Sequence, residues 1–187
     1  LYNRVEDKFK RVRNLDVLTI DILQDNSGNI WFATHGKGVF KYNKKDNYWV
    51  NYNIKGASRF LSSSHANCLY LDNMNKIWVG TKEGLCFYNE SQDNFEPVII
   101  KGLLSNNICG IVEANGSLWL TTSKGLVCYS EEGVKEVFTS KDGLQSDFFV
   151  PNSILKSSKG TVFAGSIKGF STFNPKDVVL NTIVPSV

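Results

Sequence analysis

The chain has 187 residues, a formal net charge of +3, and 42% hydrophobic and 12% aromatic residues. This composition excludes a highly charged or low-complexity disordered chain, and the charges form no basic stripe of the kind that nucleic-acid binding requires. No apolar run reaches the ~18 residues of a membrane-spanning helix. We therefore expect no nucleic-acid partner and no membrane contact for this segment.

Short runs of β-forming residues follow one another along the chain. Residues 1–14 match the end of a repeat unit, because Tyr2 aligns with Tyr42 of the next unit. That next unit, residues 15–54, is rich in Val, Ile, Trp, Phe, Tyr and Thr, which predicts strands over residues 18–23, 30–34, 39–42 and 48–52. Similar units follow over residues 55–101, 102–140 and 141–178. No stretch shows a helical period, so the chain is expected to be nearly all β.

The units share one phrase, in which a large aromatic residue lies in the second strand and a glycine follows. The aromatic positions lie 47, 41 and 44 residues apart, and the glycines are predicted to turn the chain between the second and third strands. Repeats of this length predict about four four-stranded antiparallel blades of a β-propeller. The aromatic residues, expected to pack as wedges between blades, are Trp31, Trp78, Trp119 and Phe163, and the glycines are Gly38, Gly84, Gly125 and Gly169.

The sequence carries no recognisable catalytic, metal-binding or cofactor-binding motif. It has two histidines, no nucleotide-binding fingerprint, and no pair of carboxylates that stands out for glycoside chemistry. The four cysteines lie in first and third strands, which are not neighbours in a blade, so no pair is expected within disulfide reach. We expect Cys68, Cys86, Cys109 and Cys128 to be buried free thiols.

One set of cations is a candidate ligand-binding surface. Turns between second and third strands lie on the same face of a propeller as the connections between blades, and each of the four turns carries a lysine. Such a face would attract an acidic ligand, although exposed lysines are also common filler at hairpin tips. The lysines are Lys37, Lys82, Lys124 and Lys168, and His35, Arg59 and His65 belong to loops on the same face.

Residues 25–42 resemble the two-component regulator propeller repeat, through Asp25-Asn26-Ser27-Gly28-Asn29-Ile30-Trp31 followed by Gly38 and Tyr42. The stretch from Gly102 to Ile108 shares this resemblance. The last unit, with Asp142–Phe148 and Gly169–Pro175, is similar to the terminal blade of such propellers, which precedes an immunoglobulin-like domain.

The resemblance implies a periplasmic sensor of a hybrid two-component histidine kinase, commonly one that responds to oligosaccharides. This chain would then be the end of a larger seven-bladed propeller, with residues 179–187 as a linker to the following domain. The partners that the resemblance implies are an oligosaccharide, the rest of the propeller and that following domain, and a homodimer is a further partner that we consider. Two alternatives stay open, a propeller enzyme acting as polysaccharide lyase or glycoside hydrolase, and a pure protein-interaction scaffold.

Overall fold

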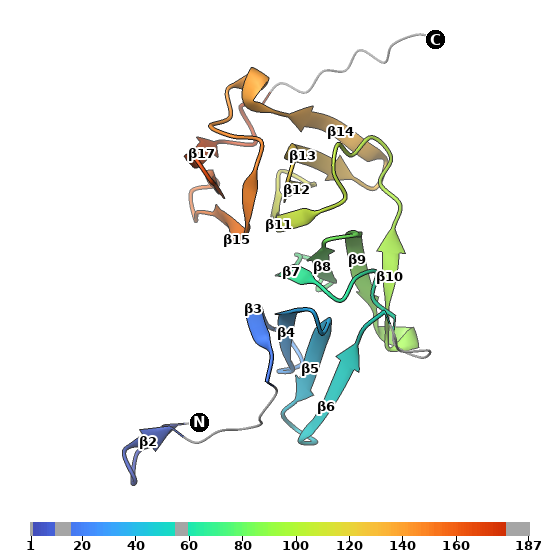
Figure 1. The fold of residues 1–187 in the computed structure, drawn as a ribbon, viewed down its shortest axis with the longest axis vertical. Helices are drawn as coiled ribbons and strands as arrows, with labels where there is room; N and C mark the ends of the chain where they lie inside the picture. Colours follow the sequence, from blue (N-terminus) through green and yellow to red (C-terminus); the bar gives the residue numbers. More distant parts are fainter. Residues whose placement is uncertain (1, 10–15, 55–59, 179–187) are drawn as a thin grey trace.

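The structure is a computed structural model that describes residues 2–9, 16–54 and 60–178. Its regular elements are seventeen β-strands and two short 3-10 turns, and no α-helix occurs among the described residues. Every strand pairing is antiparallel and joins neighbours in sequence. The sheets follow one another around a curved path, with their first strands on the inside (Figure 1). The predicted all-β propeller architecture is confirmed.

Four sheets form the blades, which are numbered here in chain order. Blade 1 contains β3 (Leu18–Gln24), β4 (Ile30–His35), β5 (Val39–Asn43) and β6 (Tyr48–Tyr52). Blade 2 contains β7 (Ala66–Leu71), β8 (Ile77–Thr81), β9 (Gly84–Asn89) and β10 (Asn94–Val98). Blade 3 contains β11 (Ile108–Ala114), β12 (Ser117–Thr122), β13 (Gly125–Ser130) and β14 (Gly133–Phe138). Blade 4 contains β15 (Phe149–Lys156), β16 (Val162–Ser166) and β17 (Gly169–Phe173).

The beginning of the chain forms a separate hairpin, β1 (Tyr2–Asn3) with β2 (Lys8–Phe9). Tyr2 pairs with Phe9 in this hairpin, at the same spacing as Tyr88 and Phe95 in blade 2. Both connections contain an aspartate with positive φ, Asp7 at 49° and Asp93 at 46°. The hairpin therefore repeats the geometry of the third and fourth strands of a blade.

The turn between first and second strands is held by a carboxylate in blades 1 and 2. Asp25 accepts the backbone N–H groups of Ser27 and Asn29, at 3.0 and 2.8 Å, and its other oxygen accepts the indole Nε1–H of Trp31 at 2.8 Å. Asp72 bonds Trp78 in the same way, also at 2.8 Å. The turn thus fixes the orientation of the large side chain in the second strand.

The hydrophobic core lies between consecutive blades, since one four-stranded sheet cannot bury both of its faces alone. Trp31 projects from blade 1 and is fully buried against rings of blade 2, with centroid distances of 4.8 Å to Tyr88 and 5.9 Å to Phe95. Tyr52 closes the same cluster at 5.8 Å from Trp31. Two further clusters occupy the interface of blades 2 and 3 and that of blades 3 and 4.

One prediction about the repeat is wrong at its last unit. Phe163 is 39% exposed instead of buried, because it lies on the face of blade 4 that has no neighbouring blade among the described residues. Blade 4 has three strands in the part of the chain that the structure describes. Leu155 and Phe170, 64% and 62% exposed, share this uncovered face with Phe163.

The four cysteines are free and buried, as predicted. Burial raises the pKa of every one of these thiols, to about 11 for Cys109. A Cβ on Gly80 would lie 2.5 Å from the Cys68 sulfur, so Cys68 fills the space that this glycine leaves in the next strand. The cysteines therefore serve as small packing groups.

Candidate functional site

The lysine edge is defined here as the four turns that carry Lys37, Lys82, Lys124 and Lys168, and the structure places each turn between second and third strands. All four lysine side chains are exposed. The turns are anchored by glycines with positive φ, 73° at Gly38 and 117° at Gly125. At both glycines a Cβ would collide with a carbonyl oxygen of the fourth strand, which explains why no larger residue occurs there.

The structure brings only part of the predicted set together. His35 of blade 1 and His65, which leads into blade 2, form an isolated β-bridge, and their rings meet edge to face at 4.4 Å. The backbone N–H of Lys82 donates to the carbonyl of His65 at 3.1 Å. Arg59 lies outside the described residues. His35, His65 and Lys82 thus lie together at the junction of blades 1 and 2.

The surroundings of His65 disfavour its protonated form. Partial desolvation, the charge of Lys82 and the neighbouring His35 together lower the pKa of His65 below its usual 6.5. His65 is therefore mostly neutral at pH 7, and the positive potential of this edge comes from its lysines.

A second candidate site lies at the opposite edge of blades 2 and 3, and sequence reasoning missed it. It is a groove of about 560 Å³ between the turn that begins at Asp72 and the turn that ends at Gly133, called here the blade 2–3 groove. Trp78 and Tyr129 line it as partly exposed aromatic side chains. Its charged lining residues are Asp72, Glu113, Glu131, Glu132 and Lys135.

The groove exists because blade 3 has a shorter outer hairpin than blade 2. In blade 2, Phe95 follows its partner Tyr88 by seven positions and fills the interface with blade 1. In blade 3, Val134 follows its partner Tyr129 by five positions, and its side chain is much smaller. Space is therefore left over Trp78, which stays partly exposed while Trp31 in blade 1 is fully buried.

The polar groups of the groove are partly committed to the fold. Asp72 holds the Trp78 indole, Glu113 accepts the backbone N–H of Asn73 at 2.9 Å, and Lys135 reaches Ser117 Oγ at 3.4 Å. The buried Oγ of Ser130, which also lines the groove, has no hydrogen-bond partner among the described residues. A partly exposed indole beside carboxylates suits a ligand with both apolar C–H groups and hydroxyl groups.

The described residues contain no group of three or more His, Cys, Asp or Glu side chains arranged to hold a metal ion. Within the same part of the chain, no helix is long and apolar enough to cross a membrane.

Comparison with known sequences identifies the repeat. A family model described as two component regulator propeller matches residues 13–36. Among curated proteins, Histidine kinase P4 of Formosa agariphila is 23% identical over 217 residues, a match that covers 88% of this chain and 16% of the kinase. The chain thus corresponds to a small part of that relative.

Solved structures share the fold of this chain. The extracellular domain assigned to a hybrid two-component system of B. thetaiotaomicron is 28% identical with a TM-score of 0.74, over 85% of this chain and 22% of that one. The extracellular domain assigned to a one-component system of the same organism has a TM-score of 0.76 at 18% identity, over 88% of this chain and 25% of that one. A virginiamycin B lyase of Staphylococcus aureus shares the fold at 15% identity and a TM-score of 0.60, over 88% of this chain and 58% of that one.

These relatives include a histidine kinase and extracellular domains assigned to two-component and one-component systems, and the extracellular domains share the fold of the blades described above. The matched residues 13–36 include Trp31 and the turn that begins at Asp25. Residues 13–36 thus match the two-component regulator propeller repeat, and the blades share the fold of the extracellular domains compared above.

Proposed function

We propose that this chain is a non-catalytic, periplasmic sensor segment of a hybrid two-component system, which binds a glycan-type ligand and relays the signal to a following domain. The relatives support the sensor role, since one is a histidine kinase and another is an extracellular domain assigned to a hybrid two-component system. The segment covers 16% and 22% of these two relatives, so kinase activity would belong to other parts of such a protein.

The observation that carries the ligand class is the partly exposed Trp78 in the lining of the blade 2–3 groove. A sugar ring presents C–H groups on its faces and hydroxyls at its rim, so it can pack on the indole while its hydroxyls donate hydrogen bonds to the carboxylates. The groove volume of about 560 Å³ falls in the range of small-molecule sites. Because carboxylates outnumber lysines in its lining, the groove favours a neutral sugar over a uronate.

The lysine edge is the alternative binding surface, and it favours an acidic ligand instead of a neutral one. Its four lysines would attract a uronate or sulfated oligosaccharide, and that attraction would weaken as salt screens the charges. The two surfaces lie at opposite edges of the blades, so substitutions in one surface leave the other intact and show which of them binds the ligand.

Calorimetric titration with neutral and acidic oligosaccharides tests the proposal. Trp78→Ala should abolish the binding of a neutral ligand, while Trp49→Ala, a matched loss of a partly exposed tryptophan in blade 1, should leave it unchanged. Serine at all four lysine positions should weaken an acidic ligand only, and most at low salt. A ligand that is cleaved during the titration would favour the enzyme alternative, and binding by neither surface would favour the interaction scaffold.

A further inference from the structure

We propose that a small basic pocket between blades 3 and 4 binds an oxyanion, namely a sulfate or phosphate group carried by a soluble ligand. The pocket lies at the edge where first strands turn into second strands, opposite the lysine edge. It shares no lining residue with the blade 2–3 groove, so the inference stands independently of the proposed function.

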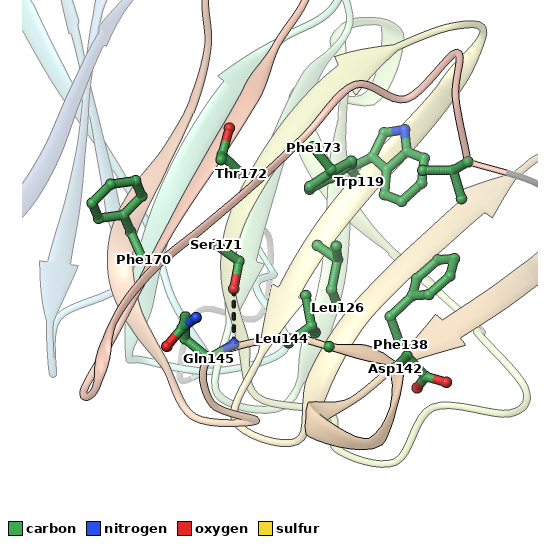
Figure 2. Close-up of a pocket in the computed structure, with 12 residues that line it drawn as sticks. Trp119, Leu126, Phe138, Asp142, Leu144, Gln145, Phe170, Ser171, Thr172 and Phe173 are labelled. Carbon is green, nitrogen blue, oxygen red and sulfur yellow. Dashed lines mark hydrogen bonds between the residues drawn. The ribbon is translucent and has the colours of Figure 1, made fainter.

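Two cavities lie between blades 3 and 4, and their linings differ. The larger, of about 380 Å³, is mainly apolar and lies beside Trp119, Phe138 and Phe173 (Figure 2). The smaller, of about 250 Å³, is called here the basic pocket, and no Asp or Glu of the described chain lines it. Its lining includes the lysines Lys156, Lys159 and Lys176 and the serines Ser157 and Ser158.

The turns that form the basic pocket have the opposite charge in blade 2. Ser157 occupies the position that Asp72 has in the turn between the first two strands. Pro175 occupies the position that Glu90 has after the third strand. Blade 4 therefore lacks both carboxylates and has three ammonium groups at matching positions. These lysines stand where blade 2 has Leu71, Met74 and Ser91.

The exchange of aspartate for serine also changes the hydrogen bonding of the turn. In blade 2, Asp72 accepts the backbone N–H groups of Met74 and Lys76, at 2.9 and 2.8 Å. In blade 4, the Ser157 hydroxyl accepts the N–H of Thr161, the counterpart of Lys76, at 3.1 Å. The N–H of Lys159 is the counterpart of the Met74 N–H, and none of the described residues accepts it. Lys159 thus offers a backbone donor in addition to its ammonium group.

The turn on the blade 3 side brings no carboxylate to the pocket either. Glu113 stands at the position of Asp25, but its carboxylate accepts the backbone N–H of Asn73 in blade 2 at 2.9 Å. Its backbone carbonyl accepts the ammonium group of Lys156 at 2.5 Å. An ammonium group has three N–H donors, so this contact positions Lys156 and leaves two donors for a ligand.

The donors around the basic pocket match a compact anion with several acceptor oxygens. Three ammonium groups, two hydroxyls and a backbone N–H surround a space of about 250 Å³. A sulfate or phosphate group offers more oxygens and more charge to such a set than a carboxylate does. The lining ends at Lys176, whereas residues 179–187, predicted to be a linker, lie outside the described part of the chain.

Calorimetric titration of the full chain with sodium sulfate and, separately, sodium phosphate tests the site, at an ionic strength held constant with sodium chloride. The triple variant Lys156→Gln, Lys159→Gln and Lys176→Gln should weaken binding by about tenfold or more, because it removes the charges that attract the anion. The matched control replaces three exposed lysines outside this pocket and outside the lysine edge, and it should change the affinity by less than about twofold. These control substitutions are Lys44→Gln, Lys45→Gln and Lys101→Gln. The salt that binds more tightly identifies the group.

Ser157→Asp supplies a second test, because it restores the carboxylate of blades 1 and 2. The variant should keep the melting temperature of the unsubstituted chain, since Asp25 and Asp72 hold the same turn there. It should no longer bind sulfate or phosphate, because the new carboxylate repels them. Absence of binding to the unsubstituted chain, equal losses in the two triple variants, or binding retained by Ser157→Asp would each overturn the proposal.

Discussion

The Asp25–Trp31 hydrogen bond should make a large contribution to the stability of blade 1. Trp31 is fully buried, and its indole Nε1–H donates to Asp25 at 2.8 Å. Replacement of Asp25 by alanine leaves this N–H inside the core without an acceptor and removes the acceptor of two backbone N–H groups in the turn.

The magnitude follows from the donors that lose their partner. A buried donor left unsatisfied costs about 1–3 kcal/mol, whereas the turn amides near the surface can bond water instead. We therefore expect Asp25→Ala to lower the free energy of unfolding by about 2–4 kcal/mol. Asparagine should rescue little, because its amide N–H₂ would face either the Trp31 indole or the donors of the turn.

A double-mutant cycle with Trp31→Phe, measured by urea denaturation, isolates the bond, since phenylalanine lacks the indole donor. The coupling energy should be about 1–3 kcal/mol. Blade 3 supplies the control: the buried Nε1 of Trp119 has no partner among the described residues, so Glu113→Ala at the matching turn should cost under about 1 kcal/mol. A coupling below about 0.5 kcal/mol would refute the reasoning.

Three further predictions follow from local geometry. The pKa of His65 is lower in the folded chain than in the unfolded chain. The free energy of unfolding should therefore be constant above about pH 6.5 and should fall as the pH drops through the folded pKa. In urea titrations, His65→Gln should make the free energy of unfolding less dependent on pH. Gly38→Ala should lower the melting temperature more than Gly84→Ala, because a Cβ collides with the Tyr52 carbonyl only at Gly38, and equal losses would contradict this. The four cysteines should resist alkylation in the folded chain and all react after denaturation; rapid labelling of the native protein would disprove their burial.

The repeat made most of the fold predictable from sequence. Strands predicted over 18–23, 30–34, 39–42 and 48–52 agree with β3 to β6 within one residue at each end, because β-forming runs alternate with turns of recognisable chemistry. The exposure of Phe163 was not predictable in this way. Its phrase matches the other units, but burial depends on a neighbouring blade and not on the repeat itself.

The candidate site was less predictable than the fold. The lysine edge followed from spacing alone, and whether it binds a ligand stays a prediction. The blade 2–3 groove depends on a length difference between two outer hairpins, which opens space over a tryptophan of the preceding blade. The signal was in the sequence, since Val134 follows Tyr129 after five positions where Phe95 follows Tyr88 after seven. This difference in spacing predicts a groove only once the structure shows that these residues face the previous blade.

Hydrogen exchange of the chain, with and without a saturating neutral oligosaccharide, tests the sensor proposal most directly. The account predicts that protection rises in the segments that line the blade 2–3 groove, residues 72–78, 113–118 and 129–135, and that the ligand is recovered intact. Protection confined to the lysine edge would contradict the assignment of the groove. Recovery of a cleaved ligand would contradict the claim that this propeller segment senses without catalysis.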